Sequence, residues 1–263
     1  QLFPTTAPYC DLDLVPKFNY DIEKAELINC PSCKKNELKF IYQAGDAAAA
    51  AIVDDIAADL ALVGISAVPE PKATRDDLNA DMQAGKFNIV FSETWGNPYD
   101  PHGYLASWKA PNEAHHKVLE NLDGKLDASI YGNRVDAILS EPDESKRAQL
   151  YTSLLNDIHQ AYIHIPLYGK RMPSVINKRL MGYTPGNQQF DYPVHKLRAV
   201  TGSNVVTVAP GSSGGLFDSV GRLDPHSYRP NEFWANNWVY EGLVKFGVNG
   251  IEPALASSWS IGK

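Results

Sequence analysis

The residues best suited to hold a small molecule lie between Thr94 and His102, in the run Thr-Trp-Gly-Asn-Pro-Tyr-Asp-Pro-His. Gly96 removes side-chain bulk, and the two prolines of the run stiffen its backbone. Such a loop can present Trp95 and Tyr99 to a cleft, where an indole offers an apolar face and a phenol offers a hydrogen bond. The alternative is that Trp95 is simply a core residue.

The three cysteines could carry redox or metal chemistry, and Cys30 and Cys33 form a CxxC. A thioredoxin-type pair normally opens a helix after a strand, whereas this one follows an expected helix over residues 21–28 and precedes a strand. A zinc site needs about four Cys or His ligands, and no fourth ligand is close in sequence. We therefore expect a structural disulfide among Cys10, Cys30 and Cys33, with thiols as the alternative. A disulfide favours an oxidising compartment.

Composition excludes several classes of protein. The formal net charge is −7, and no basic run is present, which argues against a nucleic-acid partner. No apolar stretch reaches the roughly 18 to 20 residues that cross a membrane. The chain shows no Ser-His-Asp order, Gly-rich phosphate loop or HExxH motif, so we do not expect an enzyme.

The elements that must position the loop form a strand–helix–strand–helix–strand pattern over residues 37–92. The expected elements begin with a strand over 38–42, in which Leu38, Phe40 and Tyr42 alternate, and a helix from the Asp46 cap to Gly64. A strand over 65–68 follows, then a helix from the Thr74 cap to Gly85 with Asp77 completing a capping box, and a strand over 87–91. This order predicts an α/β unit with right-handed crossovers. Ligands of such sheets lie beyond the carboxyl ends of the strands, and the Trp95 loop directly follows one of them.

The rest of the chain is less regular. Helices are expected at 129–140 and 143–163, and the second carries an apolar stripe that we interpret as core, namely Tyr151, Leu154, Leu155, Ile158 and Tyr162. Residues 165–200 indicate short strands separated by Pro and Gly. A strand-like run at 205–208 and an aromatic helix at 232–243 follow, and we expect Val239, Tyr240 and Leu243 of that helix to be core residues.

Several of these motifs carry a resemblance to a known family. A Trp-Gly followed by an Asp-Pro, here Trp95-Gly96 and Asp100-Pro101, resembles the large solute-binding proteins of ABC importers, in the peptide- and nickel-binding family 5. The Tyr-Asp-Pro-His version is most similar to the nickel-binding branch. Residues 1–198 resemble the carboxy-terminal half of the family, and residues 204–259 resemble its amino-terminal stretch. The halves are thus in reversed order, which indicates a permuted, tandem or processed version.

The resemblance implies an α/β protein with part of a two-lobed, periplasmic-binding-protein-like fold, in which helices flank mixed sheets. Residues 1–168 then correspond to an α/β domain of the second lobe, and residues 169–200 to strands that return to the first lobe. Residues 201–215 are a junction and loop, and residues 216–263 are the amino-terminal-like part of the first lobe.

The resemblance also implies further site residues. Tyr228 falls where the nickel branch has a cleft tyrosine, and Phe233 falls where it has a methionine. That branch places a metal-contacting histidine where this chain has Glu113, and His115 or His116 could replace it. Imidazole suits nickel and carboxylate suits harder cations, so Glu113 at this position departs from the nickel-binding pattern. The resemblance itself implies nickel held as a chelate as one candidate ligand. The alternatives are a surface histidine pair without metal and, for His102, a buried and hydrogen-bonded histidine.

The function implied is capture of a small ligand, such as a metal chelate or a short peptide, between two lobes for transport by a membrane permease outside the cytoplasm. The alternative is a structural or accessory subunit that keeps the fold without transporting a ligand. The family's middle section has no counterpart in this chain, and we expect another chain or a second copy to supply those strands, because unpaired strand edges are unfavourable.

Overall fold

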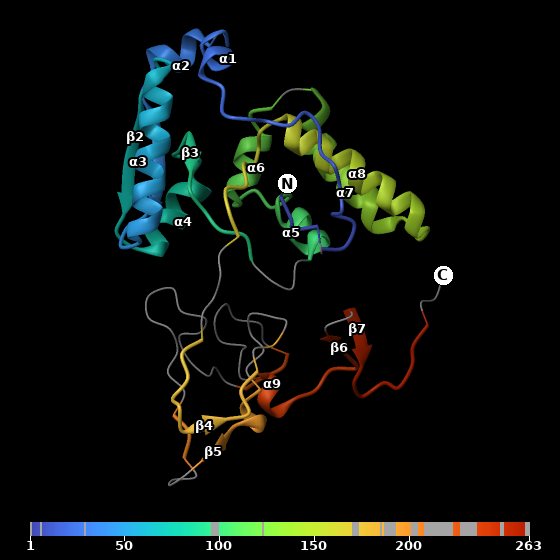
Figure 1. Cartoon of the computed structure of the whole chain (residues 1–263). Coiled ribbons are helices and arrows are strands. Elements are labelled where there is room, and N and C mark those ends of the chain that lie inside the picture. The colour runs from blue at the N-terminus through green and yellow to red at the C-terminus, as the bar shows by residue number, and fades with distance from the viewer. Residues whose placement is uncertain are drawn as a thin grey trace. The chain divides into compact units, whose positions relative to one another are not determined.

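The computed structural model of the chain divides into two compact units that meet in sequence between Leu167 and Tyr168 (Figure 1). Unit 1 comprises residues 1–95 and 99–167, and unit 2 comprises residues 96–98 and 168–263. The structure describes residues 2–5, 7–28, 30–95, 100–122, 124–169, 174–184, 186, 193–200, 205–207, 223–226, 236–247 and 250–260. The assignment of these units to the lobes of a binding protein stays a prediction.

A three-stranded parallel sheet in the order β2-β1-β3 forms one half of unit 1. Its strands are β1 (Leu38–Gln43), β2 (Ala67–Lys72) and β3 (Ile89–Val90). Helix α3 (Ala47–Leu62) connects β1 to β2 and runs along both strands, and α4 (Arg75–Gln83) connects β2 to β3 (Figure 1). This alternation confirms the predicted α/β fold class.

Local side-chain contacts fix both connecting helices where the sequence predicts them. The Asp46 carboxylate accepts hydrogen bonds from the backbone N–H groups of Ala48 and Ala49 at the start of α3. Thr74 and Asp77 form the predicted capping box at the start of α4. Each such cap satisfies backbone donors that the first helical turn leaves without partners.

The strands differ from the prediction in two respects. First, β2 covers residues 67–72 rather than 65–68 and includes Pro69 and Pro71. It is an edge strand, where a residue without an N–H group is tolerated. Second, Phe40, Ile41 and Tyr42 of β1 are all buried, so the strand does not alternate between core and solvent. A central parallel strand is covered on both faces, which explains the continuous burial.

Helices build the second half of unit 1 around a separate core. They are α5 (Pro101–Ser107), α6 (Ala114–Leu119), the 3₁₀ helix η1 (Gly124–Leu126), α7 (Ala128–Ser140) and α8 (Glu144–Gln160). The amino-terminal segment contributes Phe3 and Leu14 to this core. The first four residues of the predicted α8 stripe are buried, but Tyr162 is exposed. The helix ends at Gln160 and Tyr162 has a φ of 55°, which turns its side chain out of the stripe.

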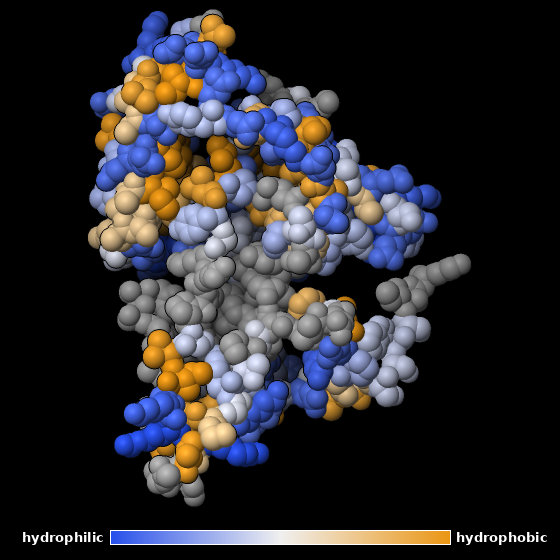
Figure 2. All heavy atoms as spheres, viewed as in Figure 1, coloured by the Kyte–Doolittle hydropathy of each residue, from blue (hydrophilic) through white to orange (hydrophobic). Residues whose placement is uncertain are grey.

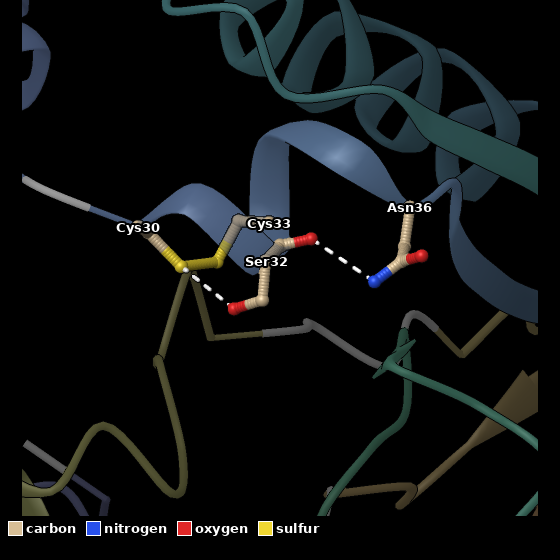
Figure 3. Close-up of a disulfide and its surroundings, with 4 residues drawn as sticks. All are labelled: Cys30, Ser32, Cys33 and Asn36. Carbon is tan, nitrogen blue, oxygen red and sulfur yellow. Dashed lines mark hydrogen bonds between the residues drawn. A yellow bond between two sulfur atoms is a disulfide. The ribbon is translucent and has the colours of Figure 1, made fainter.

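The cysteines confirm one expectation and correct another. Cys30 and Cys33 form the expected disulfide (Figure 3). Cys10 lies buried in the helical core. The pair follows α1 (Ile22–Glu26), as predicted, but it also opens a short helix, α2 (Pro31–Lys35). The helical context that we judged absent is therefore present, because Pro31 favours the first position of a helix.

Unit 2 consists of small elements. They are β4 (Leu180–Met181) paired antiparallel with β5 (Arg198–Ala199), the 3₁₀ helix η2 (Val194–Lys196), helix α9 (Asn236–Val239), and the antiparallel pair β6 (Val244–Gly247) and β7 (Gly250–Pro253). The described part of the predicted run at 205–208, residues 205–207, is not a strand. Of the predicted helix at 232–243, residues 232–235 lie outside the described residues, and the described helix ends at Val239.

None of the described residues of unit 2 is buried. Val239, Tyr240 and Leu243 were predicted to be core residues, but their exposed fractions are 59%, 48% and 70%. No described residue covers them, so the apolar pattern of this segment does not build a core here. Figure 2 shows further apolar residues at the surface around β4 and β5. Among the helices that the structure describes, none has the length and apolar character of a membrane span.

Candidate functional site

Trp95 lies beyond the carboxyl end of β3, where the chain leaves the parallel sheet. The N–H group of Phe91 still donates to the carbonyl of Ile41 at 3.0 Å, so the sheet pairing ends four residues before the indole. Trp95 is 56% exposed. A core role for Trp95 is therefore wrong for the described structure, and its apolar face is accessible to a ligand.

The indole of Trp95 rests on helix α5. Its ring meets Tyr104 edge-on, with 5.2 Å between the ring centroids. The Asp100 carboxylate caps α5 by accepting the N–H group of Gly103 at 3.0 Å. A Cβ atom on Gly103 would lie 2.7 Å from Asp100 Oδ2 and 3.6 Å from Trp95 Cζ3. Glycine at this position therefore allows the cap and the indole to approach the helix closely.

Tyr104 gives this arrangement a rigid base. It is buried and also contacts Phe3 and Trp108 edge-on, with centroid distances of 5.7 Å and 5.8 Å. Burial raises the pKa of Tyr104 to about 12, so the phenol is neutral across the physiological range. The sequence analysis missed both Gly103 and Tyr104. The signal was present, because Asp100-Pro101 is a helix start and places Tyr104 in the first turn of the helix.

His115 and His116, the predicted metal ligands, are engaged by Trp108 in two different ways. The His115 ring stacks on the Trp108 indole, with 4.0 Å between centroids and 2° between planes. The Nδ1 atom of His116 lies 3.0 Å from the Trp108 carbonyl oxygen, and its Nε2 atom faces Glu120 at 3.6 Å. Both side chains are partly buried, so a surface histidine pair is the wrong description.

The stack continues beyond His115 to a second histidine that the sequence analysis did not single out. The rings of His115 and His164 are 5.7 Å apart and nearly parallel. Burial, with an added contribution from the neighbouring His164, lowers the pKa of His115 to about 3. Burial also lowers the pKa of His164. Both imidazoles are therefore neutral at pH 7.

Glu113, the third predicted ligand, precedes α6 at the capping position, and its side chain makes no capping hydrogen bond. Among the residues that the structure describes, no group of three or more His, Cys, Asp or Glu side chains is arranged to hold a metal ion. The metal role of Glu113, His115 and His116 stays a prediction. His102 stacks on Tyr151 at 5.2 Å, and burial lowers its pKa.

Three of the predicted cleft residues, Tyr99, Tyr228 and Phe233, lie outside the described residues. Near the second of them, the Asp224 carboxylate accepts the N–H group of His226 at 3.0 Å. The meeting of Trp95 with Tyr228 across a groove is therefore still a prediction.

A small hollow in unit 1 lies between the amino-terminal segment and α8. Apolar side chains line most of it, together with Cys10, His159 and His164. It has room for about one water molecule. This hollow is too small to enclose a chelate or a peptide, so it is not the expected ligand site.

Comparisons with known proteins support the resemblance. No protein-family profile matches the chain. The nickel-binding periplasmic protein of Escherichia coli (strain K12) is 29% identical over 202 residues, which cover 70% of this chain and 37% of the relative. Among solved structures, NikA from Brucella suis in complex with Fe(III)-EDTA matches with a TM-score of 0.60 and 24% identity, over 75% of this chain and 42% of that one.

A periplasmic oligopeptide-binding protein from Thermotoga maritima matches more weakly, with a TM-score of 0.40 and 16% identity over 54% of this chain and 27% of that one. The chain thus spans little more than a third of the length of the curated relative that it matches. The predicted resemblance and the predicted α/β fold are both confirmed: the chain is similar to the nickel-binding periplasmic protein over 70% of its length, and 75% of it shares the fold of the matching part of the Brucella suis structure.

Proposed function

We propose that this chain is a solute-binding protein, or a descendant of one, which captures a small ligand for an ABC-type importer. The observation that carries the proposal is the 29% identity with a nickel-binding periplasmic protein over 70% of the chain. An accessible indole at the carboxyl edge of the parallel sheet supports it, because ligands of open α/β sheets bind there.

In this proposal, Trp95 supplies an apolar face, and Tyr99, Tyr228 and Phe233 line the rest of the cleft. Closure of two lobes on the ligand excludes water and buries most of the ligand surface. The rigid base under Trp95, made by Tyr104 and the close approach at Gly103, holds the indole in place before the ligand arrives. A preorganised contact of this kind loses little side-chain entropy on binding.

The ligand class that we favour is a metal chelate, with nickel as one candidate metal. The Trp108 indole stacks on the ring of His115, and the Trp108 carbonyl oxygen lies within hydrogen-bond distance of His116 Nδ1. These contacts leave the two predicted ligands poorly placed to bind one bare metal ion together. A metal already wrapped by a chelator needs aromatic surface and hydrogen bonds instead. The Brucella suis relative was solved in complex with Fe(III)-EDTA, a ligand of this kind. A short peptide is the second candidate ligand.

The test is calorimetry with three probes: Fe(III)-EDTA, Ni²⁺ with histidine, and Ni²⁺ with a polycarboxylate. We expect the protein to bind at least one of them, and Trp95→Ala to weaken that binding about tenfold, since an aromatic contact contributes about 1.5 kcal/mol. Trp259→Ala is the matched control, because Trp259 is also exposed, at 49%, but lies near the end of unit 2. Absence of heat with all three probes, or equal losses in both variants, would contradict the proposal.

The corresponding location is outside the cytoplasm, with a membrane permease as partner. The relative is named as periplasmic, and the Cys30–Cys33 disulfide agrees with an oxidising compartment. We do not propose an enzymatic activity, since the relatives are binding proteins. The idea that another chain supplies the family's middle section has no support in the comparisons.

One observation favours the alternative of an accessory subunit that keeps the fold without transport. None of the described residues of unit 2 is buried, and several of its large apolar side chains are exposed. Exposed apolar surface of this kind is typical of a binding partner's contact area. Size-exclusion chromatography distinguishes the two functions: a fixed partner together with no response to any probe supports the accessory subunit.

A further inference from the structure

We propose that the Cys30–Cys33 disulfide is a redox-active site, which a dithiol reductant opens by thiol–disulfide exchange while unit 1 stays folded. The inference does not depend on the proposed transport function. It depends on where the disulfide lies, on how little of the fold it holds together, and on the hydroxyl group beside one of its sulfur atoms.

The disulfide is accessible from solvent. Cys30 and Cys33 are partly exposed, and the two residues between them, Pro31 and Ser32, are exposed. The pair closes a turn at the start of α2, and neither cysteine belongs to either core of unit 1 (Figure 3). A thiolate must approach a disulfide sulfur to attack it, and access of this kind is a condition of exchange.

The disulfide contributes little to holding the fold together. A cross-link stabilises a protein mainly through the loop that it closes, and the effect grows with the length of the loop. The sequence separation here is 3, so the bond joins residues that are already neighbours in one turn. Hydrogen bonds hold the same turn independently, because the Ser32 carbonyl accepts the Asn36 backbone N–H at 3.3 Å and the Asn36 side-chain amide at 3.1 Å.

Ser32 distinguishes the two sulfur atoms. Its Oγ lies 3.7 Å from Cys30 Sγ, and because the bonded sulfur carries no hydrogen, the hydroxyl is the donor (Figure 3). A donor at this position stabilises negative charge on Cys30 more than on Cys33. Since exchange is faster when the leaving sulfur is the better-stabilised thiolate, Cys30 is the leaving group and Cys33 is the sulfur attacked.

The exchange then has two balanced steps. A thiolate of the reductant attacks Cys33 Sγ and forms a mixed disulfide, while the Cys30–Cys33 bond breaks and its electron pair goes to Cys30 as a thiolate. The second thiol of the reductant loses its proton and attacks the reductant's own sulfur in the mixed disulfide, which releases Cys33 as a thiolate. The reductant leaves as a disulfide, two electrons enter the protein, and solvent protons neutralise the new thiolates according to pH.

Cys10 does not compete in this chemistry. It is buried in the helical core, and burial raises its pKa to about 12. A buried thiol of that kind is inert towards exchange. The reduced protein therefore presents two reactive thiols, which makes the reaction easy to count.

The first experiment exposes the native protein to dithiothreitol or to reduced thioredoxin, then alkylates it and maps the labels by mass spectrometry. We expect labels on Cys30 and Cys33 and none on Cys10, with circular dichroism and the thermal unfolding midpoint essentially unchanged. If reduced thioredoxin reacts faster than dithiothreitol at equal dithiol concentration, the reductant of this disulfide is a protein. If thioredoxin reacts at the same rate or more slowly, the reductant is a small dithiol. Reduction only in denaturant, or loss of structure on reduction, would overturn the proposal.

The second experiment tests the role of Ser32. Ser32→Ala removes the hydroxyl group but leaves the backbone bonds to Asn36, and we expect it to slow reduction about threefold, in keeping with the loss of one weak hydrogen bond. Ser145→Ala, at an exposed position of α8, should leave the rate unchanged. Equal rates for the Ser32 and Ser145 variants would overturn the assignment of Cys30 as the leaving sulfur.

Discussion

His115 shows how packing decides the charge of a single side chain. Its ring is enclosed between the indole of Trp108 and the ring of His164. Protonation would place a positive charge in this stack with little access to water, which is why its pKa is lowered to about 3. In the unfolded chain the same imidazole titrates near its ordinary value of about 6.5.

This difference predicts that stability falls in mild acid. Below pH 6.5 the unfolded chain binds a proton at His115 that the folded chain does not bind, so the free energy of unfolding decreases until the pH reaches the folded pKa of about 3. For His115 alone, the expected loss between pH 7 and pH 5 is about 2 kcal/mol. His164 and His102, whose pKa values are also lowered, act in the same direction.

Urea unfolding at both pH values measures the effect. His115→Phe keeps an aromatic ring against Trp108 and removes the proton, so we expect this variant to lose less stability on acidification than the natural protein. His226→Phe is the control, because the His226 side chain is 90% exposed and has no burial to relieve. If the His115 and His226 variants respond to pH alike, the buried stack is not the cause.

Local chemistry at single residues was predictable from sequence, whereas long-range contact was not. Asp46 and Thr74 were correctly predicted as caps because their partners lie within three residues of them. The stack of His115 was not predicted, since it depends on His164, which comes from a distant part of the chain. Trp95 was identified as a site residue from its motif, but its support by Tyr104 became evident only in the structure.

At the scale of elements, the start of α5 is the feature that connects the fold to the candidate site. The cap at Asp100 and the indole of Trp95 both approach Gly103 closely, so the helix start and the exposed indole depend on the same glycine. Glycine inside a helix ordinarily costs stability, because it loses more backbone entropy than alanine. Its presence in α5 is explained by the space that the cap requires.

A matched pair of substitutions tests this explanation. Gly103→Ala places a Cβ atom 2.7 Å from Asp100 Oδ2, so the cap must shift, and we expect the free energy of unfolding to fall by about 1 kcal/mol. Gly132→Ala lies within α7, where the nearest atom is Lys109 Cε at 3.9 Å, and should raise the free energy of unfolding by about 0.5 kcal/mol.

Urea unfolding of both variants gives the two values, and calorimetry with Fe(III)-EDTA checks whether Gly103→Ala also weakens binding. An increase in stability for both variants would show that Asp100 does not need the space above Gly103. If Gly103→Ala binds Fe(III)-EDTA as tightly as the natural protein does, the start of α5 does not contribute to ligand binding.

The order and type of the elements in residues 38–91 followed from the sequence, but their exact bounds did not. Helix starts were correct because capping residues mark them. The extent of β2 was wrong because its two prolines hide a strand that tertiary pairing with β1 stabilises. The burial of three successive residues in β1 was also missed, since the alternating pattern describes a sheet with one open face.

At the scale of the whole molecule, the two units differ in how much core they contain. Every buried residue of the described structure lies at or before Ile158, in unit 1. The aromatic helix expected at 232–243 predicted core residues in unit 2 as well, namely Val239, Tyr240 and Leu243. That prediction was wrong because periodicity indicates which face of an element is apolar, and not whether the chain supplies something to cover it.

This difference predicts that unit 2 opens locally at lower free energy than unit 1, because exposed backbone and few buried apolar contacts give little protection. Limited digestion with a non-specific protease should therefore cut first after Tyr168 and leave a resistant fragment that ends near Leu167, the boundary between the units. Hydrogen exchange should show the slowest amides in β1, α3, α7 and α8. Mass spectrometry identifies the fragment and assigns the amides.

The same digestion tests the proposed function at this scale. If residues of unit 2 line the cleft, a bound ligand stabilises the folded form of both units by mass action, and saturating Fe(III)-EDTA should slow the first cuts in proportion to its affinity. Trp95→Ala should reduce this protection, and Trp259→Ala should preserve it. First cuts within residues 38–160 would contradict the division into a protected and an open unit. If calorimetry shows that the ligand binds but the ligand does not change the rate of the first cuts, the whole site lies in unit 1.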